Sequence, residues 1–236
     1  MPWLTVIIVF LAVFTQSLTG FGSALVSMAV LPELLGIQVA APLVALMAGT
    51  LEALLLVRYW RDLNLRAVWR LAVASVIGIP IGVLALRVAD ERLILTLLGM
   101  VLAGYALYAL RTPNLPQLKW PGWAFGFGFA AGLLGGAYNT AGPPVIVYGN
   151  SRRWSPAEFK CNLQGIFLIG DALVIAGHAV SQNLTSVVWN NYLIALPAMG
   201  LGIVAGLSLE KKIDPAKQRR IVLWLLLIMG VRLILA

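Results

Sequence analysis

The chain has 236 residues, of which 61% are hydrophobic and only 11% are charged, whereas soluble domains carry about 25% charged residues. This composition excludes an ordinary soluble domain, and apolar runs of about 20 residues, the length that spans a bilayer, recur along the chain. The net charge of +8 resides mainly in short loops between these runs, which indicates membrane topology and not a nucleic-acid partner. The single cysteine, Cys161, excludes a disulfide framework within the chain, and no metal or other cofactor is expected.

The first predicted element is an apolar helix that is interrupted by helix breakers at Thr19–Pro32, with the sequence TGFGSALVSMAVLP. Three apolar segments follow it, at residues 39–57, 71–86 and 93–110. Irregular backbone at membrane depth is tolerated only where it is buried in protein or lines a cavity. The interrupted element is therefore a candidate binding segment.

A second set of four segments follows a stretch of linker composition at residues 113–121. Its first member, Gly132–Gly149 (GLLGGAYNTAGPPVIVYG), is again rich in helix breakers. The remaining members are apolar segments at residues 166–176, 192–209 and 221–230. We therefore predict an N-terminal membrane repeat at residues 1–112 and a C-terminal membrane repeat at residues 122–236, which together form one transport domain.

Matching glycines support this division. In each half a Gly-xxx-Gly pair precedes an aspartate by eight residues, and a long apolar segment follows. The matching positions are Gly78, Gly82 and Asp90 in the first half and Gly202, Gly206 and Asp214 in the second. Internal repeats of this kind are common in secondary transporters.

The distribution of basic residues predicts how the segments cross the membrane. If each interrupted segment enters and returns as a hairpin, 14 loop lysines and arginines fall on one side, and only Arg87 and Arg92 lie opposite. A single crossing would divide them 10 to 6, so the positive-inside rule favours the hairpin. The charged stretch Glu210–Arg220 is then a solvated turn on the cytoplasmic side. Lys160 is counted among the basic loop residues on the same side.

Three full crossings after each hairpin invert the second half relative to the first. The predicted fold class is an all-α polytopic membrane protein with two inverted four-segment repeats, each a broken helical hairpin followed by three spanning helices. We expect it in the cytoplasmic membrane, with both termini on the non-cytoplasmic side.

The two interrupted segments supply the predicted substrate site. A helix that restarts after a break presents free N–H groups and a positive dipole end, which favour an anion. In the alternative reading, the glycines only let helices pack closely. The candidate substrate-binding residues are Gln16, Thr19, Gly20, Gly22 and Ser23 in the first segment, Gly135, Gly136, Tyr138, Asn139 and Thr140 in the second, and Asn162 and Gln164, which bind substrate or bridge helices.

The paired glycine-rich segments, each opening one half, together with the Gly-xxx-Gly helices, resemble the sulfite exporter TauE/SafE family, also called the toluene sulfonate uptake permease family. The resemblance covers essentially the full length. It implies a membrane permease for a small sulfur-containing or organic anion, such as sulfite, sulfoacetate or a sulfonate. The chain departs from the usual Gly-Gly-Gly run of the first motif, because Gly20-Phe21-Gly22-Ser23 stands there.

Two acidic residues lie within apolar segments, where an ionised carboxylate costs several kcal/mol. They are Glu52 and Asp171. Either is a candidate for carrying a proton coupled to transport. In the alternative reading, a snorkelling Arg58 reaches Glu52, which lies six residues earlier.

We therefore predict a secondary transporter that moves a small anion through a midplane site between the repeats, with protons as a possible coupling ion. An anion channel or facilitator without ion coupling shares all these features and remains the alternative. A membrane enzyme is not expected, because the sequence has no catalytic constellation. Substrate anion, lipid bilayer and protons are the expected partners, and the sequence leaves a monomer and a homodimer equally open.

Overall fold

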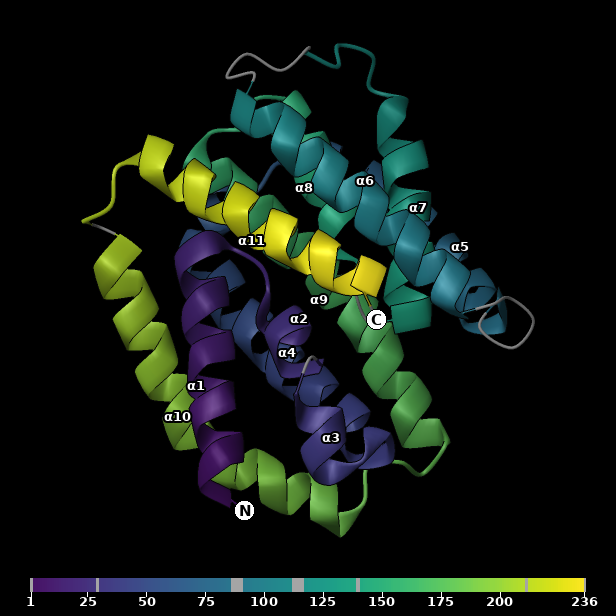
Figure 1. Cartoon of the computed structure of the whole chain (residues 1–236), viewed down its shortest axis with the longest axis vertical. Helices are drawn as coiled ribbons and strands as arrows, with labels where there is room; N and C mark the ends of the chain where they lie inside the picture. Colours follow the sequence, from purple (N-terminus) through teal and green to yellow (C-terminus); the bar gives the residue numbers. More distant parts are fainter. Residues whose placement is uncertain are drawn as a thin grey trace. The chain divides into compact units, whose positions relative to one another are not determined.

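The computed structural model describes residues 2–28, 30–85, 91–111, 117–138, 141–210 and 212–235, and this part of the chain contains helices and no strands (Figure 1). The helices are α1 (Pro2–Thr19), α2 (Ser23–Met28), α3 (Leu31–Leu35), α4 (Ile37–Tyr59), the 3-10 turn η1 (Trp60–Asp62), α5 (Leu65–Ala85), α6 (Glu91–Arg111), α7 (Trp123–Tyr138), α8 (Gly142–Ser151), α9 (Pro156–Val180), α10 (Ser186–Glu210) and α11 (Pro215–Leu235). The predicted all-α class is confirmed.

Four described helical stretches are long and apolar enough to cross a membrane: Ile37–Asp62, Leu65–Gly82, Pro156–Val180 and Ser186–Glu210. Shorter apolar helices lie at Trp3–Thr19, Trp123–Gly136 and Leu223–Arg232. Many of their apolar side chains are exposed, including Leu201 and Val204 of α10. Such surfaces suit the hydrocarbon of a bilayer.

The chain divides into two compact units, each built from both halves of the sequence. Unit 1 comprises Met1–Val68 and Lys160–Lys212, and unit 2 comprises Trp69–Phe159 and Ile213–Ala236. The predicted boundary at residues 113–121 concerns the sequence repeats, so it stays a prediction. Each unit is described below by itself.

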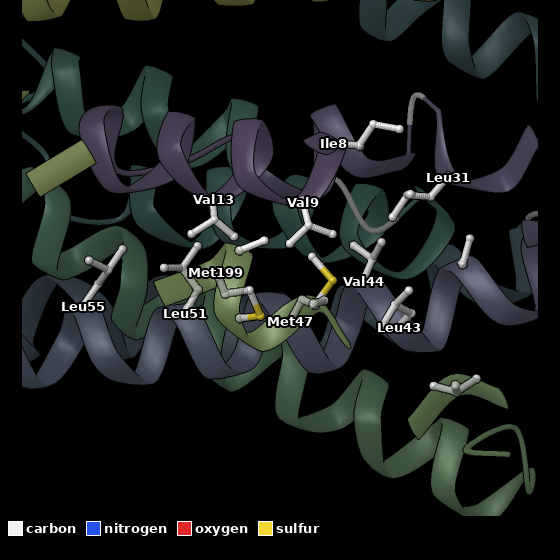
Figure 2. Close-up of a cluster of buried hydrophobic side chains, with 14 residues drawn as sticks. Ile8, Val9, Val13, Leu31, Leu43, Val44, Met47, Leu51, Leu55 and Met199 are labelled. Atoms are coloured by element: carbon white, nitrogen blue, oxygen red, sulfur yellow. The ribbon is translucent and has the colours of Figure 1, made fainter. Parts of the chain in front are cut away.

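In unit 1, α1 and α10 lie side by side (Figure 1). Gly202 and Gly206 of α10 allow this approach, because a Cβ at Gly202 would lie 2.9 Å from the carbonyl oxygen of Phe10. The core of the unit joins α1, α4 and α10: Figure 2 shows Val9 and Val13 of α1 directed toward Met47 and Leu51 of α4 and Met199 of α10.

The first interrupted segment reverses the chain within unit 1. Gly20 and Gly22 adopt φ angles of +91° and +108°, which side chains other than glycine rarely adopt. After this turn, α2 and α3 run back, so that Leu31 packs in the same buried cluster as Ile8 and Val9 (Figure 2). The segment therefore forms a hairpin.

The second interrupted segment forms a hairpin of α7 and α8 in unit 2. The rings of Phe127, near the start of α7, and Tyr148, near the end of α8, have centroids 5.6 Å apart. The Leu118 N–H donates to the Ser151 carbonyl oxygen at 3.0 Å, and Arg152 Nη1 donates to the Leu118 carbonyl oxygen at 2.6 Å. The segment thus begins and ends at the same place.

Small residues bring α5 and α7 together in unit 2. A Cβ at Gly78 of α5 would lie 2.5 Å from the Phe129 carbonyl oxygen, and one at Gly132 of α7 would collide with the Ser75 carbonyl oxygen. This interlocking of glycines with facing backbone is typical of membrane helix pairs.

The helix pairs within the units are reciprocal between the two halves of the sequence. In unit 1 the broken helix α1 of the first half packs on the Gly-xxx-Gly helix α10 of the second half. In unit 2 the broken helix α7 of the second half packs on the Gly-xxx-Gly helix α5 of the first half. The last helices of the halves, α6 and α11, pack on each other where Gly99 meets Gly230.

Candidate functional site

The C-terminal end of α1 is a buried helix terminus whose carbonyl groups are bound by side chains of α9. A helix end leaves carbonyl oxygens without backbone partners, and these need partners where water is excluded. Lys160 Nζ donates to the carbonyl oxygens of Leu18 at 2.6 Å and Ser17 at 3.2 Å. Gln164 Nε2 donates to the Gly20 carbonyl oxygen at 2.7 Å. Side chains from one turn of α9 therefore fix the conformation of the backbone where α1 ends.

Gln16 connects the two sides of this break. Its Oε1 accepts from the Ser23 N–H at 3.1 Å and also from the Ser23 hydroxyl. Its Nε2 donates to Gln164 Oε1 at 3.1 Å. All three side chains are buried, so their amide and hydroxyl groups form a hydrogen-bonded network shielded from solvent.

Thr19 and Gly22 shape the turn itself. The Thr19 hydroxyl lies 2.8 Å from the carbonyl oxygens of both Thr15 and Phe21. A Cβ at Gly22 would lie 3.4 Å from Thr15 Cγ2. The structure thus brings together all five predicted residues of the first segment, and it adds Gln164 of α9 to them.

Sequence reasoning missed an ion pair next to this break. Lys160 Nζ lies 2.9 Å from Glu210 Oε1, with the lysine side chain 3% exposed and the glutamate side chain 21% exposed. The Tyr59 hydroxyl donates to Glu210 Oε2 at 2.5 Å. The interpretation of Glu210 as part of a solvated turn, and of Lys160 as a loop charge, is therefore wrong. The four-residue spacing of Lys160 and Gln164, which places both on one helix face, was the available signal.

The two acidic residues within spanning helices form a pair in unit 1. The carboxyl groups of Glu52 on α4 and Asp171 on α9 are close neighbours, and the Gln16 side chain also lies near Glu52. Gly49, one turn before Glu52, faces α9: a Cβ added there would lie 3.1 Å from Ile175 Cδ1 and 3.9 Å from Asp171 Cβ. Among the described residues Glu52 forms no ion pair with Arg58, so the alternative of a snorkelling Arg58 is not supported.

One oxygen of each carboxyl group in this pair is buried and unsatisfied. Glu52 Oε2 and Asp171 Oδ2 are buried atoms without a hydrogen-bond partner among the residues that the structure describes. A lone buried carboxylate oxygen carries a large desolvation cost. The pair is therefore chemically suited to hold a proton or another small positive charge.

These groups form one continuous polar chain through unit 1. It begins at Tyr59, the last residue of α4, and passes through Glu210 and Lys160 to the end of α1. Gln164 and Gln16 then lead to Glu52 and its partner on α9. The chain links one end of the helices with positions further along α4 and α9.

The other predicted residues have different surroundings. Asn162 Oδ1 accepts from the Asn64 N–H at 2.9 Å, so it bridges α9 to the start of α5. In unit 2, Gly136 packs against the Ile79 backbone, and Gly135 lies beside Ala141. For Gly136 the close-packing reading is supported.

Tyr138 ends α7, and its side chain is not among those described. Asn139 and Thr140 lie outside the described residues, so their predicted roles stay predictions.

A bundle of apolar helices with broken segments and a buried polar chain has the construction of a membrane transporter. The chain belongs to the sulfite exporter TauE/SafE family, whose model matches residues 5–233. It is 27% identical over 229 residues, covering 94% of this chain and 89% of the relative, to the Cupriavidus necator protein named "Probable sulfite/organosulfonate exporter TauE". It is also 27% identical over 176 residues, or 74% of each chain, to the Comamonas testosteroni protein named "Probable inner membrane transporter protein TsaS". No solved structure matches the chain.

Proposed function

We propose that this protein is a secondary transporter that moves a small sulfur-containing anion, such as sulfite, sulfoacetate or a sulfonate, across the cytoplasmic membrane. The observation that carries the proposal is the continuous buried polar chain of unit 1. Buried polar groups in a membrane protein are costly, and they mark substrate and ion pathways. The names of the two relatives, an exporter of sulfite and organosulfonates and an inner membrane transporter, support the substrate class and the membrane.

The substrate path runs along the first interrupted segment. Gln16 and Ser23 contribute buried amide and hydroxyl groups there, and Gly20 and Gly22 form the turn with φ angles of +91° and +108°. The predicted role of the second interrupted segment, Gly135 to Thr140, in substrate binding is part of this proposal.

The repeats are inverted, with three full crossings after each hairpin and both termini on the non-cytoplasmic side. The reciprocal helix pairs support this arrangement, because each half contributes its broken helix to one unit and its Gly-xxx-Gly helix to the other. The return of each hairpin to its starting point supports the hairpin model over a single crossing of each interrupted segment.

Transport is coupled to protons through the Glu52–Asp171 pair. Two neighbouring buried carboxylates repel each other, so the pair holds a proton more readily than an isolated carboxyl group does. Loss of that proton leaves two negative charges side by side, which repel an anion as well as each other. The pair therefore favours anion binding in its protonated form and release after deprotonation.

The test is transport by the purified protein in liposomes. We expect uptake of radiolabelled sulfite, sulfoacetate or taurine to saturate, to show counterflow and to respond to an imposed pH gradient. Simple carboxylates serve as the comparison substrates. Saturable counterflow that does not respond to pH would refute the proposed proton coupling. Unsaturable flux with unitary currents would show that the protein is a channel and not a carrier. Movement of a cation with no anion binding would overturn the proposal.

A further inference from the structure

We propose that Lys160 and Tyr59 form an oxyanion-binding subsite, and that the Glu210 carboxylate occupies this subsite until the transported anion displaces it. This inference rests on the proposed function. It adds two binding residues and one internal competitor to the transport path.

The geometry of the ion pair is that of a two-point oxyanion receptor. The two oxygens of the Glu210 carboxylate are bound separately, Oε1 by Lys160 Nζ at 2.9 Å and Oε2 by the Tyr59 hydroxyl at 2.5 Å. Sulfite and sulfonates present the same edge, two oxygens on one central atom. A receptor that binds an O–C–O edge with one cationic and one neutral donor can therefore bind an O–S–O edge.

The donors are held in place independently of Glu210. An ammonium group has three donors, and Lys160 directs two of them to the carbonyl oxygens of Ser17 and Leu18 at 3.2 and 2.6 Å. Its ammonium also lies 6.0 Å from the centroid of the Tyr59 ring. Only the third donor of Lys160 is available to an anion, and it is the one that Glu210 occupies.

Glu210 is the member of this cluster that is best placed to leave. It is the last residue of α10, whereas Lys160 and Tyr59 belong to α9 and α4. Its side chain is 21% exposed, compared with 3% for Lys160, so solvent reaches the acid and not the base. A buried cation left without a counter-charge is strongly unfavourable, so the state without Glu210 is a minor one until another anion binds. An anion that binds there restores the counter-charge of Lys160.

Equilibrium binding of radiolabelled sulfite to the purified protein tests the competition. If the donors are free of Glu210 in about a tenth of the molecules, Glu210→Gln lowers the apparent Kd for sulfite about tenfold. Lys160→Met abolishes binding, and Tyr59→Phe weakens it. Glu33→Gln, which neutralises an exposed acid of α3, is the matched control and leaves the Kd unchanged. An unchanged or raised Kd in Glu210→Gln overturns the proposal.

A double variant separates this role from a structural ion pair. Removing both partners of a buried ion pair is much less harmful than removing one, so Lys160→Met with Glu210→Gln restores folding in either case. If the pair only stabilises the fold, the double variant transports sulfite with an ordinary KM, and the subsite proposal fails. If Lys160 binds the anion, the double variant folds but does not bind sulfite, while Lys160→Arg retains binding. A wild-type protein that neither binds nor transports any anion would instead overturn the proposed function itself.

Discussion

Replacing Gln164 with leucine removes the side chain that joins the break in α1 to the rest of the polar chain. Leucine has a similar size, so the change deletes hydrogen bonds with little change in volume. It leaves the Gly20 carbonyl oxygen and the Gln16 amide, which Gln164 binds at 2.7 and 3.1 Å, buried without these partners. Interhelical hydrogen bonds in membranes are worth roughly 0.6–2 kcal/mol each. With two bonds lost, we expect a destabilisation of about 1–4 kcal/mol and impaired transport.

The assay uses the chain's own cysteine. Cys161 is buried and is the single thiol, so a thiol-reactive fluorogenic dye reports unfolding on heating. Gln164→Leu should melt several degrees below the wild type, whereas Gln38→Leu, at an exposed position of α4, should not. Equal melting temperatures for the two variants would show that the Gln164 hydrogen bonds contribute no net stability.

Three further predictions follow from the same geometry. Gly20→Val forces a branched side chain into a φ of +91° and against Lys160 Cγ, 3.0 Å from the added Cβ; we expect a loss of at least about 1–2 kcal/mol, measured in the same melting assay. Glu52→Gln and Asp171→Asn should abolish accumulation driven by a pH gradient while sulfite counterflow persists, and accumulation that persists in both would refute the coupling. In a Cys161→Ser background, cysteines at positions 66 and 90 should react from opposite sides, with the N-terminus on the side of position 90; an N-terminus in the cytoplasm would refute the hairpin topology.

Features that depend on local sequence were predictable. The apolar segment at residues 39–57 corresponds to α4, Ile37–Tyr59, because a membrane span must satisfy its backbone within itself and hydrophobicity alone reveals it. The break at Gly20–Gly22 was also visible, since glycines beside small polar residues interrupt an apolar run whatever surrounds them. The sequence therefore located the helices and the turning point of the first hairpin.

Features that depend on tertiary contacts were not predictable. Lys160 follows a short polar stretch, and a count of loop charges cannot distinguish it from a solvated lysine. Its burial arises because the end of α1, about 140 residues earlier in the chain, reaches the first turns of α9. Glu52 and Asp171 were each recognised as unusual, but their pairing required α4 and α9 to meet at Gly49.

For the sequence repeats, the relation between the two halves was predictable, but the helices that contact each other were not. Gly78 and Gly82 match Gly202 and Gly206 in sequence, and this match indicated two related halves. It gave no sign that each pair contacts the broken helix of the opposite half. Gly-xxx-Gly specifies a surface that another helix can approach closely, and it does not specify which helix approaches.

The proposed anion subsite and the proposed proton site lie at opposite ends of the polar chain of unit 1. Between them, Gln16 and Gln164 are linked by a single amide-to-amide bond at 3.1 Å. Lys160 Nζ and Gln164 Nε2 both bind the end of α1, and Gln16 lies near Glu52, so we expect the two glutamines to couple the two sites. Coupling of this kind is reciprocal: if protonation of the Glu52–Asp171 pair tightens sulfite binding by some factor, sulfite binding must favour protonation by the same factor. Proton uptake measured on addition of sulfite and the pH dependence of the sulfite Kd must therefore agree, and the Gln164→Leu variant should reduce both together.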